Sequence, residues 1–102
     1  MMKIILVDLD GTLCKGESFT PEDCLKAKPI AKNIKKVNDL HLTNYIIIYT
    51  ARRDALLPAT LEWLRRNNVQ YQAISNKKAS AHIYVDNRSI HWNHDKSEVK
   101  HP

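Results

Sequence analysis

Runs of apolar, β-branched residues recur along the chain, and each is followed by polar residues. Residues 3–8 and 45–49 form the two clearest runs, and shorter ones cover residues 69–74 and 83–85. Nearly continuous apolarity is typical of strands in a parallel sheet covered on both faces. The pattern therefore predicts four buried strands, the first of which ends in an acidic segment.

Between these runs, two segments have the spacing of amphipathic helices. Behind Pro29, apolar residues recur every three or four positions as far as Leu40, and residues 58–67 repeat this spacing. The polar stretch between Cys14 and Pro29 is expected to be a loop. Strands that alternate with helices pair in parallel through right-handed crossovers. We therefore predict an α/β, small three-layer Rossmann-like fold with a mainly parallel four-stranded sheet.

The length of the chain fits one domain. Its 102 residues match the size of a single compact unit, since domains commonly have roughly 100–150 residues. We expect the core domain to cover residues 1–91. The segment 92–102 is polar and is expected to be a solvated tail.

Composition narrows the class of protein. The longest apolar runs reach only about a quarter of the ~20 residues that a membrane-spanning helix needs, so no membrane segment is expected. No secretory cleavage site follows the first run, which leads us to expect a cytoplasmic protein with reduced cysteines.

The formal net charge of +5 favours nucleic acid and small phosphate esters alike as binding partners. Charge alone therefore leaves both classes of partner open.

Polar residues follow the predicted strands at the points where each ends. The carboxyl ends of parallel strands meet at one edge of a sheet, where ligands bind in open α/β folds. Acids gathered there repel one another unless a hard cation such as Mg²⁺ lies among them, and a nearby lysine suggests a phosphate. Residues i and i+2 of an extended strand project to the same side, so two acids at this spacing can both face a phosphoryl group. The residues concerned are Asp8 and Asp10, Thr50, Lys78 and Asp86.

These motifs resemble those of the haloacid dehalogenase-like phosphatases. The segment Asp8-Leu9-Asp10-Gly11-Thr12, the strand ending at Thr50, Lys78 and Asp86 follow the order of the four motifs of that family over residues 3–90. The resemblance implies that Asp8 attacks phosphorus and forms an aspartyl-phosphate. It also implies that Asp10 protonates the leaving oxygen and later takes a proton from the hydrolytic water.

The same resemblance implies a set of binding residues. Mg²⁺ would be held by the carboxylates of Asp8 and Asp86 and by the main-chain carbonyl of Asp10. The Thr50 hydroxyl and the Ala51 amide would bind the transferring oxygens. Lys78 would offset their charge, with Lys77 as a rival for that role.

Arginines beside the motifs suit a second anionic group on the substrate, because guanidinium groups bind phosphates through two parallel hydrogen bonds. They are Arg52, Arg53 and Arg88.

The gaps between the motifs hold no cap domain, so the resemblance is to a minimal, uncapped type. An open site fits either a large substrate, such as a nucleic-acid end or a glycan, or a small one enclosed by a neighbouring subunit. The second case predicts a homo-oligomer.

Three functions follow from these observations. The leading hypothesis is a Mg²⁺-dependent phosphomonoester hydrolase that acts on a small sugar phosphate. A weaker resemblance of residues 63–88 to small phosphatases of capsule and surface-sugar biosynthesis favours that substrate. The first alternative is a polynucleotide 3′-phosphatase. The second is a catalytically silent phosphate-binding or interaction module, which Asn87 favours because many relatives carry a second acid at that position.

Overall fold

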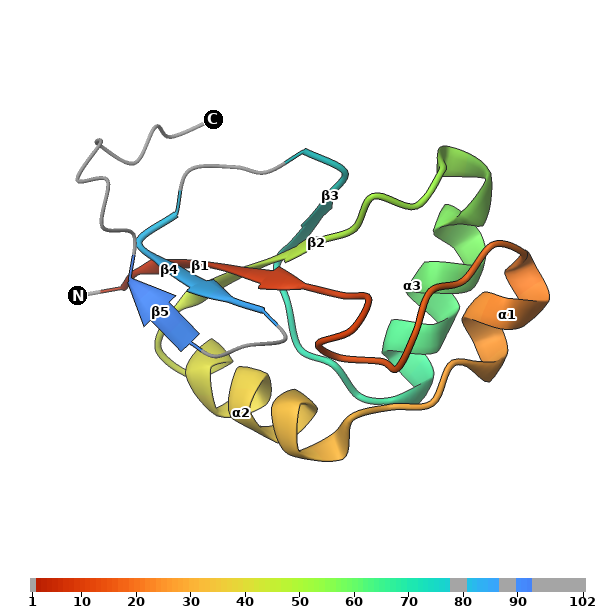
Figure 1. Cartoon of the computed structure of the whole chain (residues 1–102). Helices are drawn as coiled ribbons and strands as arrows, with labels where there is room; N and C mark the ends of the chain where they lie inside the picture. The colour runs from red at the N-terminus through yellow and green to blue at the C-terminus, as the bar shows by residue number, and fades with distance from the viewer. Residues whose placement is uncertain (1, 78–80, 87–89, 93–102) are drawn as a thin grey trace.

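The computed structural model describes residues 2–77, 81–86 and 90–92 and shows a twisted sheet with helices packed against it (Figure 1). No helix in this part of the chain is long and apolar enough to span a membrane. The elements in chain order are β1 (Ile4–Asp8), α1 (Pro21–Lys26), α2 (Ala31–His41), β2 (Tyr45–Tyr49), the 3₁₀ helix η1 (Asp54–Leu56), α3 (Leu57–Arg66), β3 (Ala73–Ser75), β4 (Ile83–Val85) and β5 (Ile90–Trp92).

The sheet has the strand order β3-β2-β1-β4-β5. All five residues of β1 pair in parallel with β2, from Ile4 opposite Tyr45 to Asp8 opposite Tyr49. Strands β3 and β4 extend the parallel sheet on the two sides, and β5 pairs antiparallel with β4 at one edge. The predicted α/β class and the mainly parallel, Rossmann-like arrangement are confirmed.

Three local features differ from the sequence-based expectation. The segment expected to be a loop contains α1, which begins at Pro21 behind Thr20; the Thr20 hydroxyl accepts a hydrogen bond from the Asp23 amide at 3.1 Å. This is an ordinary helix cap. The third strand begins at Ala73 rather than at Val69, because the Val69 amide bonds to the Leu64 carbonyl at the end of α3. The short antiparallel strand β5 was not predicted.

The core lies between the sheet and the helices. Ile5 and Val7 of β1 are fully buried on one face, and Ile46 and Ile48 stand beside them in register on β2. Both helix-bearing crossovers lead the chain in the same direction, from β1 to β2 and on to β3, and right-handed connections place such helices on one face. The helices contribute Ile34, Val37, Trp63 and Leu64 to the same cluster.

Alternation along β1 then sets the position of the first acid. Because Val7 faces the helices, Asp8 projects from the opposite face at the carboxyl end of the strand. Asp86 follows Val85, the residue paired with Val7, so Asp8 and Asp86 occupy neighbouring strand ends.

Candidate active site

A cavity of about 560 Å³ opens at the carboxyl ends of β1 and β2. Both strand ends contribute to its wall, as do the loop that leads to α1 and Leu56 at the end of η1. The lining includes predicted site residues from two separate segments of the chain. They are Asp8 and Asp10 after β1, and Thr50, Ala51, Arg52 and Arg53 after β2.

A tight turn after β1 holds Asp10 over this cavity. The Leu9 carbonyl accepts hydrogen bonds from the amides of Thr12, Leu13 and Cys14 at 3.2, 2.9 and 3.3 Å, and the Gly11 amide donates to the Cys14 carbonyl at 2.8 Å. Gly11 has φ +82°, a left-handed conformation that a residue without Cβ adopts at little cost. The turn therefore depends on the glycine of the acidic motif.

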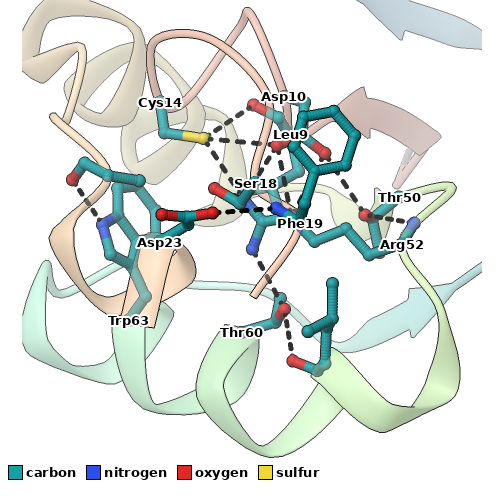
Figure 2. A network of polar contacts seen from close by, with 12 residues as sticks. Leu9, Asp10, Cys14, Ser18, Phe19, Asp23, Thr50, Arg52, Thr60 and Trp63 are labelled. Carbon is teal, nitrogen blue, oxygen red and sulfur yellow. Dashed lines mark hydrogen bonds and ion pairs between the residues drawn. The ribbon is translucent and has the colours of Figure 1, made fainter. Parts of the chain in front are cut away.

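The Asp10 carboxylate is held by a fork of hydrogen bonds from Arg52 (Figure 2). The Arg52 Nη2 lies 2.8 Å from Oδ1, and Nε lies 3.2 and 3.3 Å from Oδ1 and Oδ2. The Arg52 side chain is only 5% exposed, and that of Asp10 is 24% exposed. A bidentate pair of this kind fixes the plane of the carboxylate as well as its position.

The remaining donors of Arg52 are also used inside the protein. Nη1 donates to the Thr60 hydroxyl at 3.0 Å, and Nη2 lies 3.4 Å from the Ser18 hydroxyl. Burial acts to lower the pKa of Arg52, but the hydrogen bonds that Arg52 donates to Asp10, together with the charge of Asp10, outweigh burial and raise the pKa above its usual value. Arg52 therefore remains charged, and its guanidinium faces Asp10 instead of open solvent.

Thr50 joins the ends of β1, β2 and β3. Its amide donates to the Ser75 carbonyl at 3.0 Å, its hydroxyl accepts from the Arg52 amide at 3.1 Å, and the same hydroxyl lies 3.5 Å from Asp10 Oδ2. This buried hydroxyl is thus directed at the acid site.

Ala51 and Arg53 are exposed beside Thr50, and the Arg53 Nη2 lies 3.4 Å from the Phe19 carbonyl. Arg52 and Arg53 both line the cavity, but only Arg53 is exposed there, because the Arg52 side chain is buried against Asp10.

The predicted metal ligands fit a hard cation by their chemistry. Asp8 and Asp86 are carboxylates at neighbouring strand ends, and the hydrogen bonds of the turn use the carbonyls of Leu9 and Cys14 rather than that of Asp10. Oxygen ligands of this type suit Mg²⁺. Within the described residues, no group of three or more His, Cys, Asp or Glu side chains is placed to bind a metal. The proposed set has only two such side chains, with the Asp10 carbonyl as a third ligand.

Cys14 lies next to the acid site but is unsuited to nucleophilic attack. Its sulfur is 3.7 Å from Asp10 Oδ1, and burial, assisted by the charge of Asp10, raises the pKa of its thiol to about 11. A thiol in this state is protonated at neutral pH, and the thiolate is the nucleophilic form. Cys14 is therefore not a candidate nucleophile. Cys24 is a buried free thiol as well.

Lys78 and Arg88 lie outside the described residues, as does Asn87. Lys77 is exposed, and its amide donates to the Ser75 hydroxyl at 3.0 Å. The assignment of Lys78 to the phosphate-binding role, with Lys77 as its rival, stays a prediction from the sequence.

Three residues at the site were not predicted from the sequence. Ser18 and Phe19 line the cavity, and Thr60 accepts a hydrogen bond from Arg52. Only Phe19 had a signal in the sequence, because it is a large apolar residue within a polar stretch.

Comparisons with known proteins give one structural likeness. No family model matches the chain, and no curated protein matches it. A chain in the structure of the Pnkp1/Rnl/Hen1 complex superposes with a TM-score of 0.64 at 14% identity, covering 95% of this chain and 31% of that chain. At this identity the likeness shows a shared fold. The present chain spans less than a third of the length of that neighbour.

Proposed function

We propose that the protein is a Mg²⁺-dependent phosphomonoester hydrolase that works through an aspartyl-phosphate on Asp8. The observation that carries the proposal is the cavity of about 560 Å³ at the carboxyl edge of the sheet, whose lining includes Asp8, Asp10, Thr50 and Ala51. Two carboxylates, a hydroxyl and a main-chain amide there are the groups that phosphoryl transfer from an ester requires. The sequence resemblance assigns the same residues to those roles.

In the proposed reaction, an Asp8 oxygen attacks phosphorus while the bond from phosphorus to the ester oxygen breaks. Asp10 gives a proton to the departing oxygen, so that an alcohol leaves. Water then attacks the phosphorus of the aspartyl-phosphate and gives a proton to Asp10, and the bond to Asp8 breaks to release inorganic phosphate. Bound Mg²⁺ would reduce the repulsion between the carboxylate and the phosphoryl oxygens.

The two arginines after Thr50 take different parts in this proposal. Arg52 is a positioning residue, since its donors hold Asp10, Thr60 and Ser18. Arg53, which is exposed at the cavity, is the residue that binds a second anionic group of the substrate.

The identity of the ester is a further part of the proposal. A small sugar phosphate, and a neighbouring subunit that encloses it, stay predictions from the sequence. The polynucleotide 3′-phosphatase is retained as the second candidate because an aromatic ring, that of Phe19, stands exposed in the cavity wall. The likeness to a chain of the Pnkp1/Rnl/Hen1 complex supports this candidate through the shared fold alone.

The test is a comparison of the wild type with Asp8→Asn on a panel of phosphorylated metabolites and 3′-phosphorylated oligonucleotides in the presence of Mg²⁺. We expect Asp8→Asn to lower turnover by at least about 100-fold, because the nucleophile is lost. Asp39→Asn is the matched control, since Asp39 is an exposed carboxylate on α2 paired with Lys35. A variant that keeps several per cent of the wild-type rate contradicts the covalent mechanism. A blank wild-type panel favours the silent binding module.

A further inference from the structure

Phe19 is a large apolar side chain held in the open at the cavity. It is 68% exposed and lines the same cavity as Asp8 and Asp10. Its backbone is fixed on both sides, because its amide donates to Asp23 Oδ2 at 3.3 Å and its carbonyl accepts from Arg53 Nη2 at 3.4 Å. Figure 2 shows the ring on the side of Asp10 and Thr50.

The ring contributes nothing to the core, so its position calls for another explanation. Other exposed large apolar residues, such as Leu42 directly after α2 and Leu61 on α3, do not line the cavity. The neighbour Ser18 is buried and bonded to Arg52, which anchors the loop while the next side chain stays in solvent. An exposed aromatic ring on an anchored stretch of backbone, beside groups that can bind an anion, is an arrangement on which a flat heterocycle can stack.

Resting on the proposed hydrolase function, we infer that Phe19 is a specificity-determining residue that stacks on the base of a nucleoside phosphomonoester. The substrate class is then a phosphate ester whose alcohol carries a nucleobase, either as a free mononucleotide or at the end of a strand. Arg53, bonded to the Phe19 carbonyl, lies where an adjoining phosphate of a strand can meet its guanidinium.

A sugar ring can also pack on an aromatic face, but it fits this wall less well. Its hydroxyl groups need hydrogen-bond partners once they leave water, and the Arg52 donors nearest the cavity are already engaged with Asp10 and Thr60. A base presents two apolar faces to such a ring. The decisive comparison therefore keeps sugar and phosphate and removes only the base.

The experiment uses a short 3′-phosphorylated oligonucleotide and its counterpart with an abasic 3′-terminal nucleotide, together with a 3′-mononucleotide and a sugar phosphate. The proteins are wild type, Phe19→Leu, Phe19→Trp and the control Leu42→Ala, whose side chain is 79% exposed away from the cavity lining. We expect Phe19→Leu to lower kcat/KM about tenfold for base-bearing esters, since base stacking on aromatic side chains is of that order. The abasic ester should be unaffected, and Phe19→Trp should keep the preference.

Comparison of the mononucleotide with the oligonucleotide separates a free nucleotide from a strand end. Equal wild-type rates on base-bearing and abasic esters, or equal losses on both in Phe19→Leu, overturn the inference. A change of oligomeric state in Phe19→Leu by sedimentation, without a change in base preference, also overturns it and identifies a contact between copies.

Binding measurements separate this inference from the proposed function. The affinity of Asp8→Asn, with and without Phe19→Leu, is measured for both oligonucleotides by fluorescence anisotropy. Tighter binding of the base-bearing strand that is lost with Phe19→Leu supports stacking even if no ester is hydrolysed. Equal affinities reject stacking even if hydrolysis through Asp8 is observed.

Discussion

Arg52 is a buried cation whose guanidinium lies 2.8 Å from Asp10 and 3.0 Å from the Thr60 hydroxyl. The planar guanidinium donates to the Asp10 carboxylate and to the hydroxyl groups of Thr60 and Ser18. The orientation of Asp10 therefore depends on the shape of the Arg52 side chain as well as on its charge. A lysine offers one ammonium group at a single point and cannot reproduce this set of contacts.

We therefore expect Arg52→Lys to lower kcat by about 10–100-fold through misplacement of Asp10, since a displacement of about 1 Å can cost about 100-fold. The loss should be larger for alkyl phosphates, whose leaving oxygen needs a proton, than for an activated aryl phosphate. Steady-state kinetics on both esters check this, with Arg66→Lys as a control on the exposed end of α3. Equal losses on the two esters would mean that Arg52 has only a structural role.

At the same scale, the sequence predicted the acids better than their surroundings. Asp8 and Thr50 could be placed because parallel pairing brings strand ends to one edge, whereas Asp10 reaches the cavity through the turn at Gly11. The sequence suggested Arg52 as a substrate-binding residue because it lies beside a motif, and it did not predict that the guanidinium pairs with Asp10. A buried ion pair between residues far apart in the chain depends on the tertiary structure, and a local pattern carries no signal for it.

At the scale of the elements, α1 and α3 support the loop before α1, whose residues 17–19 line the cavity. Figure 1 shows them side by side, and the Trp63 indole on α3 donates to the Ala27 carbonyl at the end of α1 at 2.8 Å. Helix α1 in turn contains Asp23, which holds the Phe19 amide. The indole therefore connects the core with the loop that carries the exposed ring.

Replacing Trp63 with Phe keeps an aromatic ring in the core but removes this hydrogen bond and part of the ring. We expect a loss of about 1–3 kcal/mol in the free energy of unfolding, from an unpaired carbonyl and a small cavity. Urea denaturation measures it, and Leu61→Ala, on the half-exposed side of α3, should change stability by less than about 0.5 kcal/mol. Equal effects of the two changes would show that the Ala27 contact contributes nothing.

The elements that the sequence missed are the short ones. The spacing of apolar residues predicted α2 and α3 because each has about three turns, over which a period can be recognised. Helix α1 has six residues and β5 has three. Segments of this length show too few repeats of either period, although Thr20 followed by Pro21 is a readable helix start.

At the scale of the whole molecule, the formal net charge of +5 distinguishes the two substrate candidates by their response to salt. A strand end is held through several phosphates, each of which releases counterions on binding, whereas a mononucleotide or sugar phosphate presents one phosphoryl group. We expect log kcat/KM for a 3′-phosphorylated oligonucleotide to fall against log salt with a slope of about −0.7 for each phosphate contacted. The slope for the small esters should be much shallower.

Initial rates from low to moderate potassium chloride at constant Mg²⁺ give both slopes, and Arg53→Gln tests whether the cavity supplies one of the contacts. If Arg53 meets a phosphate of the strand, its loss should make the oligonucleotide slope shallower by roughly one contact and leave the slope for small esters nearly unchanged. The same shallow slope for all substrates, together with a higher rate on a sugar phosphate, would reject the strand end. That result would return the assignment to a small ester, for which the open cavity needs a neighbouring subunit to enclose it.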